Sequence, residues 1–508
     1  MLSLKRLQNG SDIRGVATDG VPGESITLTD EAAHLLARGF LSWLCNRTGC
    51  APHELTISVG HDSRISAPHL CHAVCTALVE GGAHVLDCGL CSTPSMFMST
   101  VLEGFRCHGA IMITASHLPF NRNGLKFFSH DGGLDKGDIA DIIRRAEEQD
   151  FPASEAGTRH PSALLDAYSA FLREKIKAGV DAPDRDHPLS GLHIVVDAGN
   201  GAGGFFVDQV LRPLGADVSG SQFLDPDGTF PNHIPNPENK QAMQAICQAV
   251  LDNHADLGII FDTDVDRSSA VDRQGHEINR NSIVALAAAL VCMDHPGTTI
   301  VTDSVTSDEL TDFIENQLYG VHHRFQRGYR NVINEAIRLN QAGTDCQLAI
   351  ETSGHAALKE NYFLDDGAYL ATRIIIQAAR MQREGKSLEQ LIAGLKHPLE
   401  AAELRFPIAG EDFLAYGDEV LEALRNYATT REDFHLAPVN HEGLRFSFGP
   451  GDGAGWCLLR KSLHDPILPM NIESNEEGGC KVIARKMQEF LQQYPRLDLT
   501  VLEKFLQA

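Results

Sequence analysis

Short apolar runs alternate along the chain with stretches that have the spacing of amphipathic helices. The runs are apolar enough for buried parallel strands, and they cover 55–60, 109–114, 192–199, 257–262, 298–303 and 347–352. Helical patterns lie between them, for example over 67–82 and 237–255, and each ends at a glycine or another polar stop. Strands that alternate with helices indicate doubly wound α/β layers.

Polar, proline-bearing stretches interrupt this alternation and indicate domain boundaries. They lie at 177–191, 292–298 and 396–410. The C-terminal part changes character, because a short strand pattern over 443–449 precedes a helical pattern near 481–494. We therefore expect an α/β fold of three related doubly wound α/β domains followed by a smaller α+β domain, with boundaries at 1–187, 188–295, 296–400 and 401–508.

Composition narrows the class of protein. Of the 508 residues, 43% are hydrophobic and 22% are charged, which is typical of a globular chain. No apolar run reaches the length of about 18 residues that a membrane helix needs. The formal net charge of -25 argues against general binding of nucleic acid. If the substrate is an anion, basic residues must gather locally to bind it.

The N-terminal sequence and the cysteines bear on the compartment. The start, MLSLKRLQNGSDIRG, lacks the long apolar core of a secretory signal. Among the 12 cysteines, Cys88 and Cys91 have no second pair at metal-binding spacing, so we expect buried free thiols in a reducing compartment. These features predict a cytoplasmic protein, or an organellar one if a presequence has been removed.

The segment ITASHLPFNRNGLKFF places Ser116 beside His117 directly after an apolar run. A serine hydrolase carries glycines two residues before and after such a serine. Thr114 and Leu118 stand at those positions here, so attack on an ester is not indicated.

The segment FDTDVDRSS carries three alternating carboxylates, Asp262, Asp264 and Asp266, at the end of another apolar run. Alternate residues of an extended loop point the same way, so the three can converge on one hard cation. Without a cation, their mutual repulsion is costly. A solvated acidic turn is the alternative, but it does not explain why a buried strand leads directly into it.

The same segment also resembles the Asp-x-Asp motif of haloacid-dehalogenase phosphatases. In that interpretation Asp262 is the nucleophile and Asp264 the acid, with Mg²⁺ nearby. The motif usually lies on an early strand, whereas here it lies mid-chain, and this interpretation gives the Ser116 loop no function.

A glycine-rich segment, DAGNGAGG, has the spacing of a dinucleotide-binding turn at Gly199, Gly201 and Gly204. The acidic residue that should follow about 20 residues later is weak, since Asp225 lies in a turn. The pattern therefore favours a structural strand-to-helix turn.

The segment ETSGH places Glu351, Ser353 and His355 at alternate positions of a strand-exit loop. Such groups can line a sugar pocket, because carboxylates and hydroxyls bond to sugar hydroxyls. A capping turn around a buried histidine is the alternative. Asp365 and Asp366 are expected to cap the following helix.

Together and in this order, the motifs resemble the α-D-phosphohexomutase superfamily, which includes phosphoglucomutases and phosphomannomutases. The resemblance spans nearly the whole chain, from GSDIRG and GHDSRISA through TASH, DTDVDR and ETSGH to LLRKSLHDP. Several independent motifs at family spacing make a strong signal.

The resemblance implies that Ser116 carries a phosphoryl group, on a loop whose backbone N–H groups can face the phosphate. Asp262, Asp264 and Asp266 are then the ligands of Mg²⁺, and an oxygen of the Ser116 phosphate completes the shell. The phosphoserine donates to a hexose phosphate, and the resulting hexose 1,6-bisphosphate turns end for end before it returns the other phosphate.

Other family positions imply contacts to the sugar and its phosphates. Glu351, Ser353 and His355 match the sugar-binding loop. Lys126 or His117 is expected to assist proton transfer or to steady the phosphoryl group. Arg14, Lys126 and Arg267 match basic positions around the phosphoserine. Arg327 or Arg330 is expected to contact the non-transferring phosphate, and Arg460 and Ser462 belong to the loop expected to hold it.

The loop expected to hold that phosphate departs from the family pattern. His464 and Asp465 replace a threonine and a glutamate, and Pro469 lies near a later arginine position. Proline removes an N–H donor and Asp465 repels phosphate unless it is turned away. Lys461 and His464 can compensate as donors. In a separate loop, Tyr329 replaces the family's histidine.

The leading hypothesis is a Mg²⁺-dependent phosphohexomutase for glucose or mannose phosphates, with hexose 1,6-bisphosphate as activator and intermediate. The alternatives are a phosphatase that uses Asp262 and a catalytically degenerate protein that only binds sugar phosphate. We expect sugar phosphates as partners, neither nucleic acid nor membrane, and a monomer or dimer.

Overall fold

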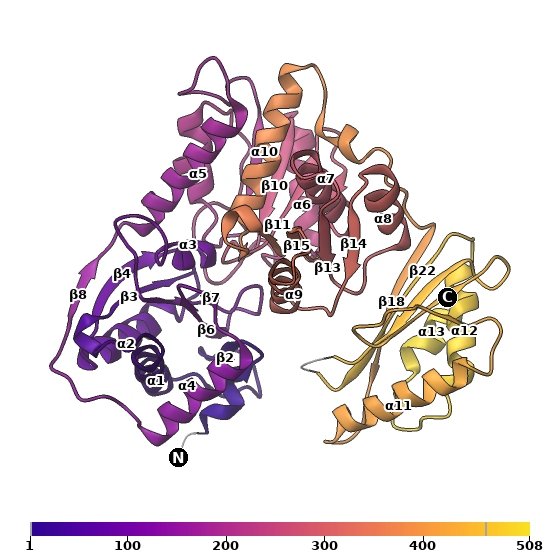
Figure 1. The fold of residues 1–508 in the computed structure, drawn as a ribbon, viewed down its shortest axis with the longest axis horizontal. Helices are drawn as coiled ribbons and strands as arrows, with labels where there is room; N and C mark the ends of the chain where they lie inside the picture. The colour runs from indigo at the N-terminus through magenta and orange to yellow at the C-terminus, as the bar shows by residue number, and fades with distance from the viewer. Residues whose placement is uncertain (1–2, 463–464, 508) are drawn as a thin grey trace. The chain divides into compact units, whose positions relative to one another are not determined.

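The computed structural model describes residues 3–462 and 465–507. The chain divides into two compact units (Figure 1). Unit 1 comprises Met1–His295 and Gln347–Ala393, and unit 2 comprises Pro296–Cys346 and Gly394–Ala508. In the described part of the chain, none of the helices combines the length and the apolar character needed to cross a bilayer.

The first sheet of unit 1 is mixed, with the strand order β1-β2-β6-β5-β3-β4-β8 and β7 paired to β6. Strand β3 runs parallel to β4 and β5, whereas β6 returns antiparallel to β5. The strands are β1 (Gln8–Asn9), β2 (Asp12–Val16), β3 (Thr56–His61), β4 (His84–Leu90), β5 (Gly109–Ile113), β6 (Arg122–Ser129), β7 (Gly132–Gly133) and β8 (Thr158–Pro161). The helices are α1 (Asp30–Thr48), α2 (Ala67–Glu80), α3 (Thr93–Met98) and α4 (Lys136–Glu148).

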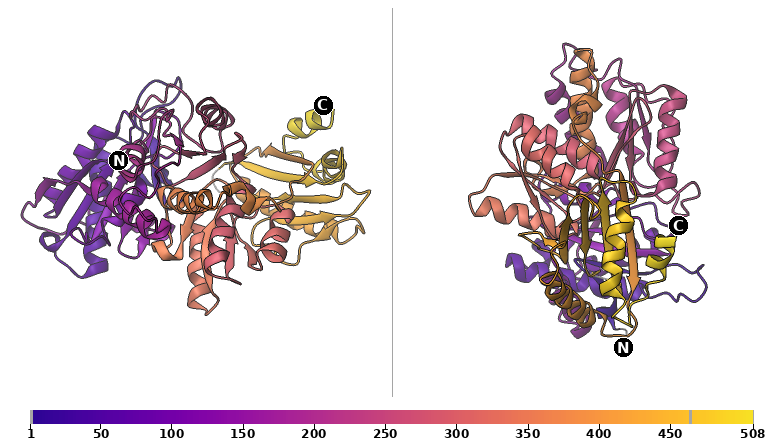
Figure 2. Two further views of the ribbon diagram at one scale, coloured as in Figure 1. Left: turned by 90° about the horizontal axis from the view of Figure 1, so that it is seen from above. Right: turned by 90° about the vertical axis from the view of Figure 1, so that its right-hand side faces the viewer.

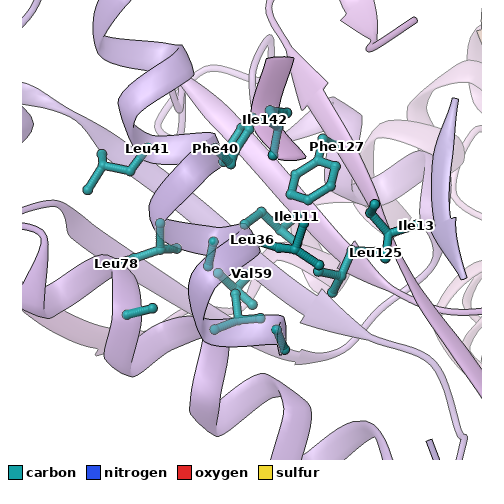
Figure 3. Packing of buried hydrophobic residues seen from close by; sticks show 14 of the residues in the cluster. Ile13, Leu36, Phe40, Leu41, Val59, Leu78, Ile111, Leu125, Phe127 and Ile142 are labelled. Carbon is teal, nitrogen blue, oxygen red and sulfur yellow. The ribbon is translucent and has the colours of Figure 1, made fainter. Parts of the chain in front are cut away.

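A core of aliphatic and aromatic side chains lies between this sheet and its helices (Figure 3). Phe40 from α1 and Ile142 from α4 lie beside Phe127 from β6, and the Phe40 and Phe127 ring centroids are 5.0 Å apart. Burying each such side chain contributes roughly 1.5–3 kcal/mol. The core therefore fixes β5 and β6, from which the Ser116 loop departs.

The second sheet of unit 1 has the order β12-β11-β10-β9, in which β9 and β10 are parallel and the other pairs antiparallel. Its strands and flanking helices are β9 (Ile194–Asp197), β10 (Leu257–Phe261), β11 (Ser268–Asp272), β12 (Glu277–Ile278), α6 (Lys240–Asn253) and α7 (Asn281–Asp294). Helix α6 begins later than the predicted 237, because the Asn239 side chain accepts from the backbone N–H of Gln241 and Ala242 and caps it there.

A third group of strands in unit 1 is antiparallel: β15 (Cys346–Ile350), β16 (Ala356–Leu358) and β17 (Leu364–Asp365). Helices α5 (Leu164–Val180) and α10 (Gly367–Arg383) pack together in the same unit (Figure 1). Asp366 caps α10 by accepting from the Tyr369 N–H, as predicted. The same prediction is wrong for Asp365, which bonds instead to His355 and to the Ala356 N–H.

Unit 2 contains a pair of parallel strands, β13 and β14, and a separate antiparallel sheet with the strand order β18-β22-β21-β20-β19. Helices α11 and α12 contribute to the core of that sheet, and α12 lies along its strands (Figures 1 and 2). The elements are β13 (Thr299–Thr302), α8 (Asp308–Asp312), β14 (Val321–Arg324), α9 (Tyr329–Gln341), β18 (Glu400–Pro407), α11 (Phe413–Ala428), β19 (His435–Leu436), β20 (Leu444–Phe448), β21 (Gly455–Leu459), β22 (Ile467–Ser474), α12 (Gly479–Leu491) and α13 (Thr500–Gln507).

The predicted fold class is confirmed: α/β regions precede a C-terminal α+β region, and each apolar run named above overlaps a strand. Parallel pairing was expected for these runs, and it holds for β3 with β5 and for β9 with β10. It does not hold for the strands that follow the polar loops. Those strands turn back antiparallel, so the sheets are mixed.

Candidate active site

Each of the three polar loops of unit 1 connects two antiparallel strands. The Ser116 loop joins β5 to β6, the aspartate loop joins β10 to β11, and the ETSGH loop joins β15 to β16. Because ladder hydrogen bonds hold both strands at the loop, each loop has fixed ends. Side-chain contacts between the loops then define one cluster within unit 1.

Ser116 lies at the centre of this cluster and is 3% exposed. Its Oγ lies 3.0 Å from Asp262 Oδ2, to which it donates, 3.2 Å from Arg267 Nη2 and 3.3 Å from His117 Nδ1. Its backbone is in the left-handed region, at φ 50°, and its N–H donates to Thr114 Oγ1. A non-glycine residue in this region costs free energy that the surrounding contacts must offset.

Arg64 holds the Ser116 loop through its backbone carbonyls. The guanidinium is 1% exposed and donates to the carbonyl oxygens of Ser116, Leu118, Pro119 and Arg122 at 2.5–2.9 Å. These contacts hold the loop in one conformation, together with the backbone N–H groups of Ala17 and Thr18, which donate to the Asn121 carbonyl.

The three aspartates converge as predicted. Ligand oxygens of Asp262, Asp264 and Asp266 lie within 4.8 Å of one another, and all three side chains are buried. Asp264 Oδ1 and Asp266 Oδ1 have no hydrogen-bond partner among the described residues. Buried carboxylate oxygens without partners are costly and are the ligands that Mg²⁺ and Ca²⁺ prefer. The residues present therefore fit a hard divalent cation.

Burial and charge act differently on the aspartates. Burial raises the pKa of Asp262 well above its ordinary value, and the Asp266 charge adds to the rise. For Asp266, the charges of Lys126, His355 and Arg267 outweigh burial and lower its pKa. The cluster thus holds at least one carboxylate that stays ionised throughout the physiological range.

Two buried cations flank the carboxylates. Lys126 Nζ donates to Asp264 Oδ2 at 2.9 Å and to Asp266 Oδ2 at 2.6 Å. Arg267 Nε donates to Asp262 Oδ2 at 3.0 Å. Neither cation forms a hydrogen bond with the Oδ1 atoms of Asp264 and Asp266, although Arg267 Nε lies 3.9 Å from Asp266 Oδ1. The two cations therefore orient the carboxylates and leave these two oxygens able to bind a metal ion.

The aspartate loop is held from two sides. Val265 has φ 67°, a strained conformation for a β-branched residue, and its carbonyl accepts from the Gly367 N–H at 3.1 Å. A Cβ on Gly367 would lie 2.5 Å from the Arg267 carbonyl carbon, so only glycine allows this approach. On the other side, a Cβ on Gly201 would lie 2.5 Å from the Thr263 carbonyl oxygen. Close packing against the aspartate loop thus explains the glycine at 201, in agreement with the structural interpretation of that segment.

The ETSGH loop brings His355 into the cluster. Its Nδ1 lies 2.6 Å from Asp365 Oδ2 and 3.9 Å from Asp266 Oδ1. Burial lowers the pKa of His355, but the two carboxylates outweigh it and raise the pKa to about 9. The ring is therefore an imidazolium at neutral pH. Glu351 and Ser353 from the same loop are buried, at 4% and 5% exposure, and the Ser353 Oγ has no partner among the described residues.

His117 and Arg14 complete the surroundings of Ser116. Burial lowers the pKa of His117 well below its ordinary value, and Arg267 and Arg14 add to the effect. Arg267 Nη2 lies 2.6 Å from His117 Nδ1, which fits a neutral ring that accepts at this nitrogen. Arg14 donates to the Ala115 carbonyl at 3.2 Å and pairs with Asp12.

The residues expected near the non-transferring phosphate lie in unit 2. Arg460 is 8% exposed, and its Nη1 lies 3.7 Å from Glu442 Oε1. The Arg327 N–H donates to Glu442 Oε2 at 3.1 Å. Glu442 therefore lies between two of the predicted residues. Arg330 lies in the first turn of α9, and its buried Nε has no partner in the described part of the chain.

The altered loop after β21 is described except at 463–464, so the predicted role of His464 falls outside the described residues. The Asp465 side chain is exposed, and its N–H donates to Ser462 Oγ. Lys461, expected to compensate as a donor to phosphate, pairs instead with Asp418. Arg460 and Ser462 are described residues of this loop and keep the family pattern.

Family models match most of the chain in three consecutive segments. The models are described as phosphoglucomutase/phosphomannomutase, alpha/beta/alpha domains I, II and III, and they match residues 5–153, 166–275 and 279–398. The chain belongs to the phosphoglucomutase/phosphomannomutase family of the α-D-phosphohexomutase superfamily. This confirms the resemblance that the motifs predicted.

Relatives of this family member align over nearly their full length. A phosphomannomutase/phosphoglucomutase of Pseudomonas syringae pv. tomato is 29% identical over 495 residues, and a phosphoglucomutase of Neisseria gonorrhoeae is 27% identical over 489 residues. Each alignment covers 96% of both chains. A solved phosphoglucomutase/phosphomannomutase family protein from Burkholderia thailandensis is 25% identical, with a TM-score of 0.79 over 97% of this chain and 98% of that one.

Two residues that shape the site, Arg64 and Thr93, have no role predicted from the sequence. Arg64 lies in the GHDSRISA motif, but the motif gave it no role. Thr93, whose Oγ1 donates to Asp264 Oδ2 at 2.5 Å, follows Cys91 and Ser92 in a segment without any recognised pattern. A buried arginine beside a strand end is a signal that could have identified Arg64. Nothing in the local sequence identifies Thr93.

Proposed function

We propose that the protein is a Mg²⁺-dependent phosphohexomutase that interconverts the 1-phosphate and 6-phosphate of glucose, mannose or both. The observation that carries the proposal is the position of Ser116. Its Oγ lies 3.0 Å from a carboxylate and 3.2 Å from a guanidinium, in a buried site where three carboxylates converge. A hydroxyl that is to carry a phosphoryl group needs positive charge nearby, and here Arg267 and a divalent cation held by the three carboxylates would supply it.

In the proposed reaction, Ser116 Oγ carries the phosphoryl group between turnovers. Transfer breaks the bond from Oγ to phosphorus and forms one from phosphorus to the free hydroxyl oxygen of a hexose phosphate. The sugar hydroxyl gives its proton to a base, and the serine oxygen, which leaves with the electron pair, takes up a proton. The bound hexose 1,6-bisphosphate then turns end for end. Ser116 Oγ takes the other phosphoryl group, so the enzyme returns to its starting form and the phosphate has changed position on the sugar.

The side chains around Ser116 support distinct roles in this scheme. Arg267 Nη2, within 3.2 Å of Oγ, can neutralise charge on a phosphoryl group there. His117, kept neutral and with Nδ1 3.3 Å from Oγ, can exchange a proton with it. Lys126 fixes two carboxylates and can steady the phosphoryl group at the same time.

Asp262, Asp264 and Asp266 are the residues that would hold Mg²⁺. When bound, the cation supplies charge neutralisation for phosphoryl transfer. The conservative variant Asp264→Asn keeps an oxygen for Lys126 but removes one negative charge. Isothermal titration with Mn²⁺ is expected to show metal affinity about 10-fold to 100-fold weaker than in the unmodified protein, since ligand charge sets the affinity of such sites.

Phosphorus NMR tests the reaction directly. The protein is mixed with Mg²⁺, a trace of glucose 1,6-bisphosphate, and either glucose 1-phosphate or mannose 1-phosphate. Growth of the 6-phosphate resonance supports the mutase, and the two rates identify the preferred sugar. Inorganic phosphate as the sole product would instead support a phosphatase that uses Asp262. An unchanged spectrum with both sugars would contradict the proposal and favour a protein that only binds sugar phosphate.

A further inference from the structure

A carboxylate lies at the centre of the arginine cluster in unit 2. Glu442 Oε2 accepts from the Ser304 hydroxyl at 2.5 Å and from the Arg327 backbone N–H at 3.1 Å. Its other oxygen, Oε1, lies 3.7 Å from Arg460 Nη1. A hydroxyl, a backbone N–H and a guanidinium are also the donors that proteins use to bind a phosphate group.

Packing fixes the backbone at Glu442, and the side chain that extends from it is buried. Its side chain is 6% exposed. The next residue, Gly443, has φ 58°, and a Cβ there would lie 2.2 Å from the Leu459 carbonyl oxygen and 2.8 Å from Arg460 Cα. Only glycine allows the chain to pass so close to the end of β21. The backbone at 442–443 therefore packs directly against the arginine that the carboxylate faces.

The same cluster contains a donor without an acceptor. The Arg460 side chain is nine-tenths buried, and its Nε has no hydrogen-bond partner among the described residues. A buried guanidinium with an unused N–H is costly unless a ligand completes it. Glu442 also lines a neighbouring cavity of about 440 Å³, large enough to admit a phosphate group, together with Gln326, His441 and Lys461. Arg460 is not among the described lining residues, but it precedes Lys461 in the chain.

Charged groups of the protein, mostly carboxylates, already surround Arg460. Burial lowers the pKa of Arg460 and the neighbouring Arg327 adds to this, whereas the carboxylates of Glu442, Glu403 and Asp303 oppose it. An incoming phosphate thus meets two guanidinium groups and three carboxylates. Of these carboxylates, Glu442 is the one that occupies the hydroxyl and the backbone N–H of the cluster.

We propose that Glu442 is an internal competing anion, which occupies the phosphate subsite of unit 2 and exchanges with the phosphate group of the substrate. The inference rests on the proposed mutase function. A mutase must release the non-transferring phosphate each time the bisphosphate turns, so a subsite that binds phosphate too tightly would slow turnover. Glu442 weakens phosphate binding and takes over its contacts when the phosphate leaves.

The matched variants Glu442→Gln and Glu422→Gln test the proposal. Both remove one carboxylate from the wall of the same cavity, but Glu422 is exposed and pairs only with Arg425 among the described residues. With inorganic phosphate as the probe, calorimetry is expected to show roughly 3-fold to 10-fold tighter binding for Glu442→Gln, because a nearby like charge is removed. Glu422→Gln is expected to leave the affinity unchanged.

Phosphate can also bind near Ser116, and a second substitution distinguishes binding there from binding at Arg460. Adding Arg460→Met to Glu442→Gln is expected to abolish the gain, since the gain depends on the Arg460 guanidinium. If Glu442→Gln leaves phosphate affinity unchanged or weakens it in a folded protein, Glu442 is a structural anchor and the proposal is wrong.

A crystal structure of the unmodified protein with inorganic phosphate tests the exchange even if Glu442→Gln does not fold. Phosphate bonded to Arg460, with Glu442 no longer accepting from the Arg327 N–H, is expected. Phosphate bound there while Glu442 keeps all its contacts would overturn the proposal. Tighter phosphate binding by Glu442→Gln in a protein without mutase turnover would retain this inference and reject the proposed function. Mutase turnover by the unmodified protein, together with an unchanged phosphate affinity of Glu442→Gln, would retain the proposed function and reject this inference.

Discussion

The aspartate cluster of unit 1 and the arginine cluster of unit 2 treat buried charge in opposite ways. In unit 1, Asp264 and Asp266 each keep one buried oxygen that accepts no hydrogen bond from the described residues, although Lys126 bonds to both carboxylates. In unit 2, the charge of Arg460 faces Glu442, a carboxylate supplied by the chain. The first cluster leaves carboxylate oxygens that an added cation can bind, whereas in the second a carboxylate of the chain already faces the guanidinium that an added anion would bind.

The two clusters therefore suit different kinds of binding. A site that leaves ligand oxygens unfilled stores unfavourable energy that a bound cation relieves, which suits tight and lasting binding. A site that carries its own counter-ion binds an added anion more weakly, which suits repeated release. We therefore expect substitutions in unit 1 to act mainly on kcat and substitutions in unit 2 to act mainly on KM.

The largest expected effect is a fall in kcat when Ser116 is replaced, and replacement of Ser462 in unit 2 serves as the comparison. Ser116→Ala removes the proposed phosphoryl carrier, so kcat for the mutase reaction is expected to fall by at least about a thousandfold, while Mg²⁺ binding persists. Ser462→Ala removes one hydroxyl near Arg460 and is expected to raise KM by less than about 10-fold. Steady-state kinetics with glucose 1-phosphate measures both. Mutase turnover retained in Ser116→Ala would reject the assignment of the carrier.

A smaller effect is expected at Arg64, whose guanidinium donates to backbone carbonyls and also lies 3.4 Å from the Asp62 carboxylate. Arg64→Met removes the donors to four carbonyls of the Ser116 loop, so the loop loses its fixed conformation. The expected fall in kcat is about 10-fold to 100-fold, because misplacement of a reacting group is costly. Arg159→Met, which breaks the partly exposed pair with Asp87, serves as control. If both variants lower Tm but neither changes kcat, Arg64 has only a structural role.

The smallest effect concerns a buried carboxylate of unit 1 outside the cluster. Asp366 accepts from the Tyr168 hydroxyl at 2.6 Å and from Asn361 Nδ2 at 3.0 Å, and burial raises its pKa to about 6. Because this pKa lies above that of an unfolded aspartate, 3.8, the stabilising contribution of Asp366 is complete below pH 3.8 and is lost as the pH rises through 6. Ionised Asp366 thus costs stability at pH 8.

Asp366→Asn is therefore expected to stabilise the protein at pH 8 by on the order of 1–3 kcal/mol, with little difference from the unmodified protein near pH 3.5. The amide keeps an acceptor for Tyr168, and Asn361 Oδ1, which has no partner among the described residues, can accept from the new amide. Urea unfolding across this pH range measures the difference. A constant difference at all pH values would show that ionisation is not the cause.

The strands could be predicted from the sequence because buried strands leave contiguous apolar runs, such as 257–262 before the aspartates. The convergence of Asp262, Asp264 and Asp266 followed from their alternate spacing. Contacts between distant segments could not be predicted in this way. Asp365 looked like a helix cap, and only the fold places it beside His355. Glu442 had no sequence signal at all, because its importance depends on Ser304 and Arg327, which lie more than a hundred residues away.

The hairpin form of the three loops has a consequence for the order of folding. Each loop closes between strands that are near in sequence, so it can form early and at small entropic cost. The bond between Ser116 and Asp262 joins residues 146 positions apart and cannot form until the two sheets of unit 1 are both in place. Recovery of catalytic competence during refolding should therefore lag behind recovery of secondary structure, which makes activity a sensitive reporter of the last assembly step.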